Sequence, residues 1–211
     1  MKPTKQRRAP AERPQEILDA ALAQFVETGF AGTRLDDVAK RAGLSKAAIY
    51  LYFDDKVSLF QGVIRQAIAA NLTTVETMLA QHRGPVAGLL PHILEFMAGR
   101  IEDTPMPSIA KLVIAESRAF PEIGRFYLKE VIGRGLPLLE GLIARGIEQG
   151  EFRKVDPAMT VRSIMGAMLL GGLWRTVFEP IGAEKLDVRA LARHHADLIL
   201  HGLQSGQEAP S

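Results

Sequence analysis

The sequence of 211 residues contains no cysteine. A chain without thiols forms neither a disulfide framework nor a thiolate metal site, and it has no cysteine nucleophile. The motifs His-Glu-x-x-His and Gly-x-Ser-x-Gly and a phosphate-binding glycine loop are absent as well. His194 and His195 are adjacent, so they point about 100° apart on a helix and make poor joint ligands. We therefore expect no enzyme activity, no catalytic residue, no metal site and no cofactor.

Long hydrophobic runs are also lacking. The longest apolar run, residues 164–174, lies between Arg162 and Arg175 and is well short of the about 20 residues that span a bilayer. The basic N-terminal residues are not followed by the apolar segment that a secretory signal needs. We expect a cytoplasmic protein that does not bind a membrane.

The net charge of the chain is small, but basic residues are concentrated at its N-terminal end. The formal net charge is +2 at pH 7, and residues 1–13 contain five basic residues against one acidic residue. A basic segment of this kind suits a polyanionic partner. It is equally typical of a solvated chain terminus. Charge alone leaves both interpretations open.

Strand signals are nearly missing, whereas helical signals run along the whole chain. Hydrophobic residues make up 47% and charged residues 24%, which is typical of a soluble globular protein. There is no sustained alternation and no Asn-Gly or Asp-Gly turn, and apolar residues recur at spacings of three and four. The pattern predicts an all-α fold with helices at about 17–28, 35–42, 46–53, 57–79, 86–102, 106–119, 122–132, 135–149, 157–178 and 187–203.

These helices divide into two predicted domains. Three short helices form an N-terminal domain at residues 11–71, and the long fourth helix connects it to a larger helical body at residues 72–205. The Asp156-Pro157 pair is a helix start signal, because it combines a cap residue with proline in the first turn.

Residues 33–56 contain the signals of a helix-turn-helix, which is expected to span about 34–53. Thr33 and Asp36 have the spacing of a capping box for the second helix. Gly43 can adopt the left-handed conformation that the following turn requires. Ser45 is expected to cap the third helix and to leave its first amides facing outward, where they can bind a phosphate.

The third helix is expected to expose an unusual face. At 100° per residue, Ile49 and Phe53 point together into the core, whereas Ala47, Ala48 and Leu51 point the opposite way. Small apolar residues permit close approach to the major groove, and nearby hydroxyl and ammonium groups can reach phosphates. The flanking residues are Lys46, Tyr50 and Tyr52. The alternative is an ordinary short helix with both tyrosines in or near the core.

Residues 11–71 resemble the DNA-binding domain of the TetR family of repressors. The matching residues are Ile17-Leu18-x-Ala20-Ala21-x-x-x-Phe25, Gly29-Phe30-x-x-Thr33, Val38-Ala39-x-x-Ala42-Gly43-Leu44-Ser45-Lys46 and Ile49-Tyr50-x-Tyr52-Phe53-x-x-Lys56-x-x-Leu59-Phe60. The resemblance implies that Thr33, Ser45, Tyr50 and Lys56 hold phosphates. It places Arg34, Lys46, Ala47, Leu51 and Tyr52 close to bases of double-stranded DNA.

The resemblance also implies a small-molecule effector and a homodimer. The dimer would form through helices at about 157–178 and 187–203, and the effector would bind inside residues 86–178. Glu116 shares an apolar face with Ile109, Leu112 and Val113, so it is either a polar anchor for a cationic effector or one half of an ion pair with an arginine. Further residues that can line a cavity, or belong to plain core, are Met97, Phe126, Tyr127, Met165, Met168 and Trp174.

The function expected from these features is a repressor that a small, mainly apolar ligand releases from a near-palindromic operator. The alternative is a DNA-binding regulator with no small-molecule ligand, controlled by a protein partner or constitutive. A cavity of a few hundred Å³ in the C-terminal body would favour the first expectation, and a filled core would favour the second.

Overall fold

The computed structural model describes residues 13–204, which form two compact units. The first unit combines residues 13–66 with Leu112–Phe126. The second unit combines Ala67–Lys111 with residues 127–204. The chain therefore passes between the units at three places, and each unit is described by itself below.

The predicted domains, 11–71 and 72–205, are continuous stretches of sequence. The periodicity of apolar residues gives no sign that a segment from the middle of the chain belongs to the first unit. The predicted basic segment at residues 1–12 lies outside the described residues.

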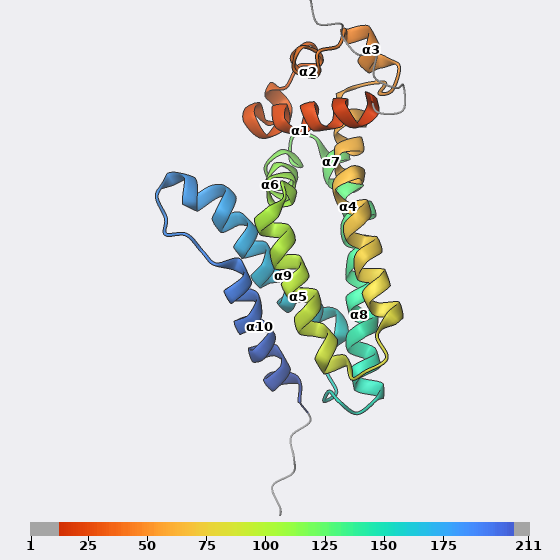
Figure 1. Ribbon diagram of the computed structural model, residues 1–211, viewed down its shortest axis with the longest axis vertical. Coiled ribbons are helices and arrows are strands. Elements are labelled where there is room, and N and C mark those ends of the chain that lie inside the picture. The colour runs from red at the N-terminus through yellow and green to blue at the C-terminus, as the bar shows by residue number, and fades with distance from the viewer. Residues whose placement is uncertain (1–12, 205–211) are drawn as a thin grey trace, which may run out of the picture. The chain divides into compact units, whose positions relative to one another are not determined.

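Helices make up almost all of the described chain (Figure 1). Between residues 13 and 204 no strand forms, and the isolated β-bridge found there pairs Phe152 with Gln204. The all-α prediction is confirmed. The helical elements are α1 (Arg13–Gly32), α2 (Leu35–Ala42), α3 (Lys46–Tyr50), α4 (Lys56–Gln81), α5 (Val86–Asp103), α6 (Met106–Glu116), α7 (Pro121–Tyr127), η1 (Leu128–Ile132), α8 (Gly133–Glu148), α9 (Pro157–Leu173), η2 (Trp174–Phe178), η3 (Glu179–Ile181) and α10 (Val188–Leu203).

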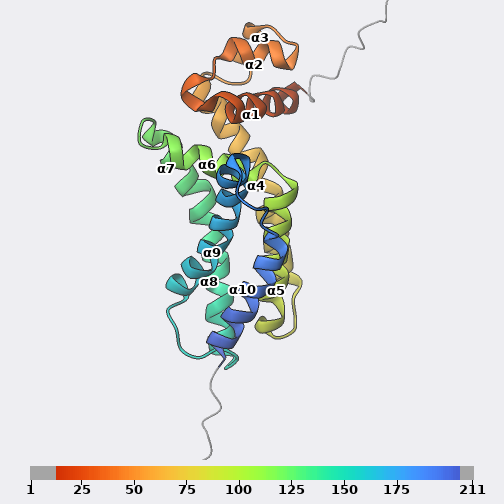
Figure 2. The same ribbon diagram turned by 90° about the vertical axis from the view of Figure 1, so that its left-hand side faces the viewer.

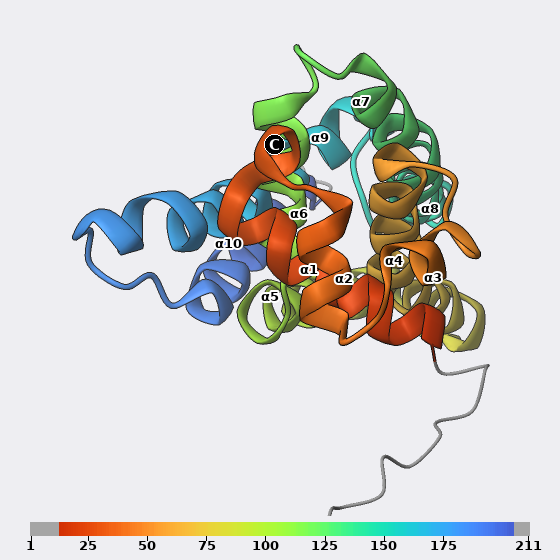
Figure 3. The ribbon, with the colours of Figure 1, turned by 90° about the horizontal axis from the view of Figure 1, so that it is seen from above.

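Two glycines shape the first unit. Gly29 interrupts α1 with φ of 75° and ψ of 170°, and the chain then makes one more turn to Gly32. Gly43 ends α2 with φ of 68°, in the left-handed conformation that the sequence predicts. Both values lie where a side chain is strained, so glycine is required at each position. The turn at Gly43 leads from α2 into α3, and α2 packs against both α1 and α3 (Figure 3).

The predicted capping box at the start of α2 is wrong. Arg34 occupies the cap position and makes no side-chain hydrogen bond there. The Thr33 hydroxyl instead donates to the carbonyl oxygen of Gly29 at 2.6 Å. The Thr33 side chain thus bonds back to α1 and does not cap α2.

The start of α4 is fixed by a reciprocal pair. The amide of Ser58 donates to the Asp55 carboxylate at 2.7 Å, and the amide of Asp55 donates to the Ser58 hydroxyl at 3.1 Å. Each side chain thus satisfies an amide at the N-terminus of the helix. The long helix expected at 57–79 is confirmed as α4, which carries the chain from the first unit into the second.

Four phenylalanines form the centre of the first unit. Phe25, Phe30 and Phe60 have ring centroids 4.9 to 5.6 Å apart, and Phe120 stacks edge-on against Phe30 at 4.8 Å. Such aromatic pairs contribute about 0.5–1.5 kcal/mol each beyond the area they bury. Phe120 comes from the middle of the chain, so this ring contact is one reason why residues 112–126 belong to the first unit.

The second unit is a bundle in which α5 lies along α10, and α8 lies along α9 (Figures 1 and 2). Asp156 caps α9 by accepting hydrogen bonds from the amides of Ala158 and Met159 at 2.8 and 3.1 Å, as the sequence predicts. The helices expected at 122–132 and 157–178 each change partway into a wider turn, η1 and η2. In the described part of the chain, no helix has both the length and the apolar character needed to cross a membrane.

Candidate nucleic-acid interface and ligand cavity

Helix α3 presents an exposed apolar and phenolic surface. Ser45 accepts a hydrogen bond from the amide of Ala48 at 3.2 Å, which fixes the start of the helix as predicted. Ile49 is fully buried, whereas Leu51 is 78% exposed and Tyr50 is 48% exposed. A large apolar side chain exposed to this degree on a capped helix has no role in the core of the first unit, so the surface is available to a partner.

The polar border of this surface comes from α2 and α3 together. Arg34, Ser45 and Ala47 are exposed, and Tyr52 is 39% exposed just beyond the end of α3. Lys46 forms an exposed ion pair with Asp36 at 3.0 Å. The structure therefore gathers all the predicted base-contacting residues on the exposed surface of the helix-turn-helix, and it does not place both tyrosines in the core.

Lys56 has a different environment from the one expected. Its ammonium donates hydrogen bonds to the carbonyl oxygens of Phe30 at 2.7 Å, Thr33 at 3.0 Å and Ala31 at 3.1 Å. It also lies 4.6 Å from the centroid of the Phe30 ring. All three ammonium protons are used at the end of α1, so the prediction that Lys56 holds a phosphate conflicts with the geometry.

Thr33 conflicts with its predicted role for the same reason. Its side chain is only 2% exposed, and its hydroxyl lies 2.9 Å from the hydroxyl of Thr28 in addition to its bond with Gly29. The hydroxyl is thus occupied inside the unit. A phosphate contact at this position is left to backbone atoms.

Glu116 also binds the end of α1. Its carboxylate accepts hydrogen bonds from the amides of Phe30 at 3.1 Å and Ala31 at 3.5 Å. Burial lowers the pKa of the Lys56 ammonium, and the negative charge of Glu116 opposes this shift. The sequence predicts either an effector anchor or an ion pair with an arginine, and no arginine pairs with Glu116 among the described residues. It satisfies the amides that the break at Gly29 exposes.

The second unit contains an apolar cavity of about 240 Å³. Residues from α4, α5, α6, α7, η1, α8 and α9 line it, and most of them are aliphatic. A cavity of this size holds a small molecule. The lining residues are Ile68, Asn71, Leu72, Val75, Ile93, Phe96, Met97, Arg100, Ile101, Met106, Tyr127, Val131, Ile132, Gly135, Leu136, Leu138, Leu139 and Met165.

Some of the predicted pocket residues line this cavity. Met97, Tyr127 and Met165 do so, and Met168 lines a smaller cavity of about 140 Å³ that shares these three residues. The others line neither cavity: Ile109, Leu112 and Val113 are buried elsewhere, Trp174 donates to the carbonyl of Glu184, Phe126 lies under the Arg65 guanidinium, and Glu116 binds the end of α1.

The polar groups of the cavity are few. Burial raises the pKa of the Tyr127 phenol, which therefore stays neutral and able to donate a hydrogen bond. The side-chain amide of Asn71 donates to the carbonyl of Ala67 at 2.9 Å, which leaves its oxygen as an acceptor. Across residues 13–204, no group of His, Asp and Glu side chains is arranged to hold a metal ion.

Sequence reasoning missed the lining residues on α4 and the arginine on α5. Ile68, Leu72 and Val75 belong to an apolar face that is visible in the sequence but looks like ordinary core. Arg100 follows Ile93 and Met97 at helical spacing, so it is a charge on an apolar stripe. The same signal singled out Glu116, and it applied equally well to Arg100.

Comparisons with known proteins agree on one family. The family model of bacterial regulatory proteins of the TetR family matches residues 17–63. The model of the AefR-like transcriptional repressor C-terminal domain matches residues 88–200, which is more than half of the chain. At 28% identity over 183 residues, the chain is similar to the uncharacterized HTH-type transcriptional regulator YfiR of Bacillus subtilis (strain 168), and the match covers 86% of this chain and 87% of YfiR.

Solved structures have the same fold. The transcriptional regulator FadR from Bacillus subtilis, in complex with stearoyl-CoA, matches with a TM-score of 0.74 at 20% identity and covers 90% of this chain and 99% of its own. A protein from Saccharomonospora viridis in complex with choline matches with a TM-score of 0.73 at 20% identity, covering 93% and 100%. The two family matches show what the fold and the exposed α3 surface indicate: the chain belongs to the TetR family of bacterial regulatory proteins, and it is a DNA-binding transcriptional regulator rather than an enzyme.

Proposed function

We propose that this regulator is a repressor that binds a near-palindromic operator as a homodimer and releases it when a small, mainly apolar compound occupies the cavity. The observation that carries the proposal is the apolar cavity of about 240 Å³ in the second unit. A regulator controlled by a protein partner, or a constitutive one, needs no such space, and its core would be filled.

The exposed surface of α3 supports the operator part of the proposal. Leu51 and Ala47 offer apolar contact to thymine methyl groups, and Tyr50 offers a hydroxyl to a phosphate. A dimer of such units reads two half-sites whose centres are about one helical turn of DNA apart.

Exposed apolar residues on α9 and α10 support the dimer. Met159, Leu169 and Leu170 on α9 are 46 to 66% exposed, and Leu198 on α10 is 56% exposed. Leaving such side chains in water is unfavourable, and a two-fold partner that repeats the same helices would cover them.

The position of the cavity in the sequence supports a regulatory role. The chain passes between the two units at residues 66–67, 111–112 and 126–127. The cavity-lining residues Ile68, Met106 and Tyr127 lie close in sequence to these three passages. A bound compound therefore contacts every segment that continues into the DNA-binding unit. FadR and the Saccharomonospora viridis protein, which have the same fold, were solved with small molecules.

The operator is tested by selecting bound sequences from random DNA. Tyr50→Phe and Lys46→Ala should weaken binding to the selected sequence by about 1 kcal/mol or more each. Lys154→Ala, an exposed lysine of the second unit, is the matched control and should leave affinity unchanged. Wild-type affinity that is no better for the selected sequence than for random DNA would refute the operator.

The ligand is tested by measuring operator affinity in the presence of a library of apolar compounds. A hundredfold loss of affinity requires about 2.7 kcal/mol of preference for the released state. Met97→Trp should fill the cavity and abolish the response while operator binding remains. Ile114→Trp, at an exposed position outside the cavity, should respond normally. A wild-type protein insensitive to every compound would favour the alternative without a ligand.

A further inference from the structure

Arg100 is the one residue of the cavity lining that carries a permanent charge. The other titratable residue there is Tyr127, which burial keeps neutral, and no aspartate or glutamate lines the cavity. The rest of the lining is aliphatic, aromatic or thioether, apart from Asn71 and Gly135. The wall of the cavity therefore has a single positive site in apolar surroundings.

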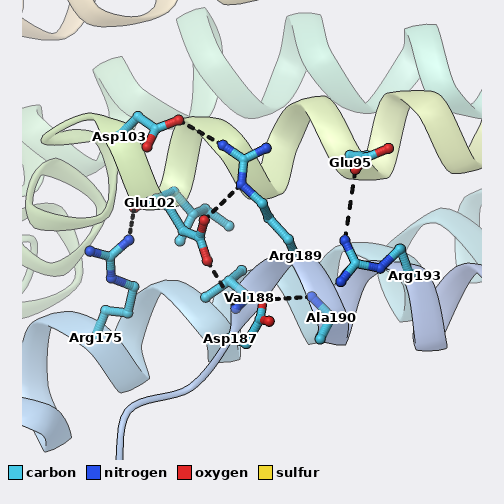
Figure 4. A network of polar contacts seen from close by, with 10 residues as sticks. Glu95, Glu102, Asp103, Arg175, Asp187, Val188, Arg189, Ala190 and Arg193 are labelled. Atoms are coloured by element: carbon cyan, nitrogen blue, oxygen red, sulfur yellow. Dashed lines mark hydrogen bonds and ion pairs between the residues drawn. The ribbon is translucent and has the colours of Figure 1, made fainter.

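The acidic residues on the same helix cannot neutralise Arg100, because arginines of α10 bind them (Figure 4). Glu102 and Asp103 each accept a hydrogen bond from Arg189 at 2.8 Å. Glu95 lies 3.8 Å from Arg193. These are all the acidic residues of α5; each contacts an arginine of α10 (Figure 4), and none of them lines the cavity.

The guanidinium of Arg100 has no partner among the described residues. No hydrogen bond or ion pair is found for its side chain within residues 13–204, and its Nε is fully enclosed and unsatisfied. A buried polar group without a partner is unfavourable, and more so when it is charged. An anionic ligand in the cavity would supply acceptors to the guanidinium nitrogens that line it, which the protein leaves without partners.

We infer that the effector is an apolar monocarboxylate whose carboxylate is bound by Arg100 and whose hydrocarbon part fills the cavity. This inference rests on the proposed function, because it names the ligand class for the same site. A carboxylate has two oxygens in the plane that a guanidinium prefers, so the pair forms two parallel charge-assisted hydrogen bonds. The Tyr127 hydroxyl and the oxygen of Asn71 remain for a second polar group of the ligand.

The charge and the volume of the cavity limit which ligands can bind in it. A cationic ligand would be repelled by Arg100 and would find no carboxylate in the lining. An engineered cavity of about 150 Å³ binds benzene, and this cavity of about 240 Å³ is larger by roughly half. It accommodates about ten non-hydrogen atoms by the same proportion. Octanoate and 3-phenylpropanoate have this size.

The test compares three ligands with one tail on the full-length protein. Calorimetric titration with octanoate, octan-1-ol and octylamine at neutral pH separates the charge of the head group from the apolar contribution of the tail. We expect octanoate to bind about thirtyfold or more tightly than octan-1-ol, as expected for a desolvated charge pair, and octylamine to bind most weakly. Octanoate should also release the operator.

Variants of Arg100 test whether this residue causes the preference for octanoate. Arg100→Met should abolish the preference for octanoate over octan-1-ol, and Arg100→Lys should keep part of it. Arg83→Met, at an exposed arginine in the loop after α4, is the control and should bind as the wild type does. If Arg100→Met does not fold, the wild-type comparison of acid with alcohol still decides.

The outcomes separate this inference from the proposed function. Equal binding of octanoate and octan-1-ol to the wild type, with release of the operator by both, would overturn the carboxylate inference and leave the ligand-responsive repressor intact. Undiminished preference for octanoate in Arg100→Met would overturn the role of Arg100. No binding of any of the three ligands, together with no response to the compound library, would overturn both.

Discussion

Replacing Lys56 by methionine removes the ammonium and keeps most of the aliphatic stem. The ammonium donates to three carbonyls, and those of Phe30 and Thr33 belong to buried residues. The third acceptor, the carbonyl of Ala31, is exposed, so water can replace the lost bond there. Leaving a buried acceptor unsatisfied costs about 1–3 kcal/mol.

From these contacts we expect Lys56→Met to lower the free energy of unfolding by about 2–3 kcal/mol, since two partly enclosed acceptors lose their donor and part of each cost is recovered by solvent. The interaction with the Phe30 ring, 4.6 Å away, adds to the loss. Replacing an ordinary surface lysine that contacts only DNA would change the free energy of unfolding by no more than about 0.5 kcal/mol.

The assay is urea unfolding followed by circular dichroism, with the denaturant slope checked for constancy. Lys40→Met is the matched control, because the Lys40 side chain is 80% exposed and lies 3.6 Å from Asp37 in an i, i+3 pair. It should change stability by no more than about 0.5 kcal/mol. Operator binding by each variant is then measured at several salt concentrations.

A Lys56→Met protein as stable as Lys40→Met would refute this reasoning. If that protein also loses about one ion from the salt dependence of operator binding, Lys56 is instead identified as a phosphate contact.

Two further predictions follow from packing. Gly146→Ala should destabilise the protein by about 1–3 kcal/mol, because the new Cβ would overlap the ring of Phe152. Gly141→Ala on the same helix has open space around it and should be neutral or stabilising by up to about 1 kcal/mol. Equal unfolding midpoints for the two variants would contradict this prediction. Leu198→Glu should shift the protein from dimer to monomer in sedimentation equilibrium, while Ile114→Glu, equally exposed on α6, should not; dimers of unchanged strength in Leu198→Glu would place the interface elsewhere.

Local signals in the sequence identified much of the fold. Gly43, Ser45 and Asp156 act within a few residues of themselves, through a left-handed turn or a bond to the next amides, so their roles could be predicted from sequence. The exposed face of α3 followed from helical periodicity alone. The buried position of Ile49 follows from the same periodicity.

Contacts between distant residues could not be predicted in this way. Glu116 lies more than eighty residues from the amides that it binds, and Lys56 lies more than twenty from its carbonyls. Glu116 binds amides that the break at Gly29 exposes, and Lys56 binds carbonyls at the C-terminal end of α1, where a helix leaves its last carbonyls unpaired. Thr33 was misassigned for the same reason, because the spacing that resembles a capping box competes with carbonyls that only the folded chain brings near.

Glu116 and Arg100 gave the same signal in sequence, a charge on an apolar helix face, yet their environments differ. Glu116 satisfies two backbone amides, so its charge is explained by the fold. Arg100 has no comparable partner, and its enclosed Nε is unsatisfied. The feature that separates Arg100 from Glu116 is thus an unmet hydrogen bond, which sequence periodicity does not report.

A structural role of Lys56 and a direct DNA contact can be distinguished, because a loss of folding stability has little effect on operator affinity while most molecules stay folded. If the wild type is stable by about 5 kcal/mol, at the low end for a protein of this kind, a loss of 3 kcal/mol still leaves about 97% of the Lys56→Met molecules folded. Partial unfolding would then lower the apparent operator affinity by only a few per cent. A tenfold loss of affinity, about 1.4 kcal/mol, would therefore require either a direct DNA contact or a displaced α1 end. Glu116→Ala distinguishes these two, since it disturbs the same end of α1 without removing a cation: a similar loss of affinity in both variants assigns the effect to the position of α1, whereas a loss confined to Lys56→Met assigns it to the ammonium itself.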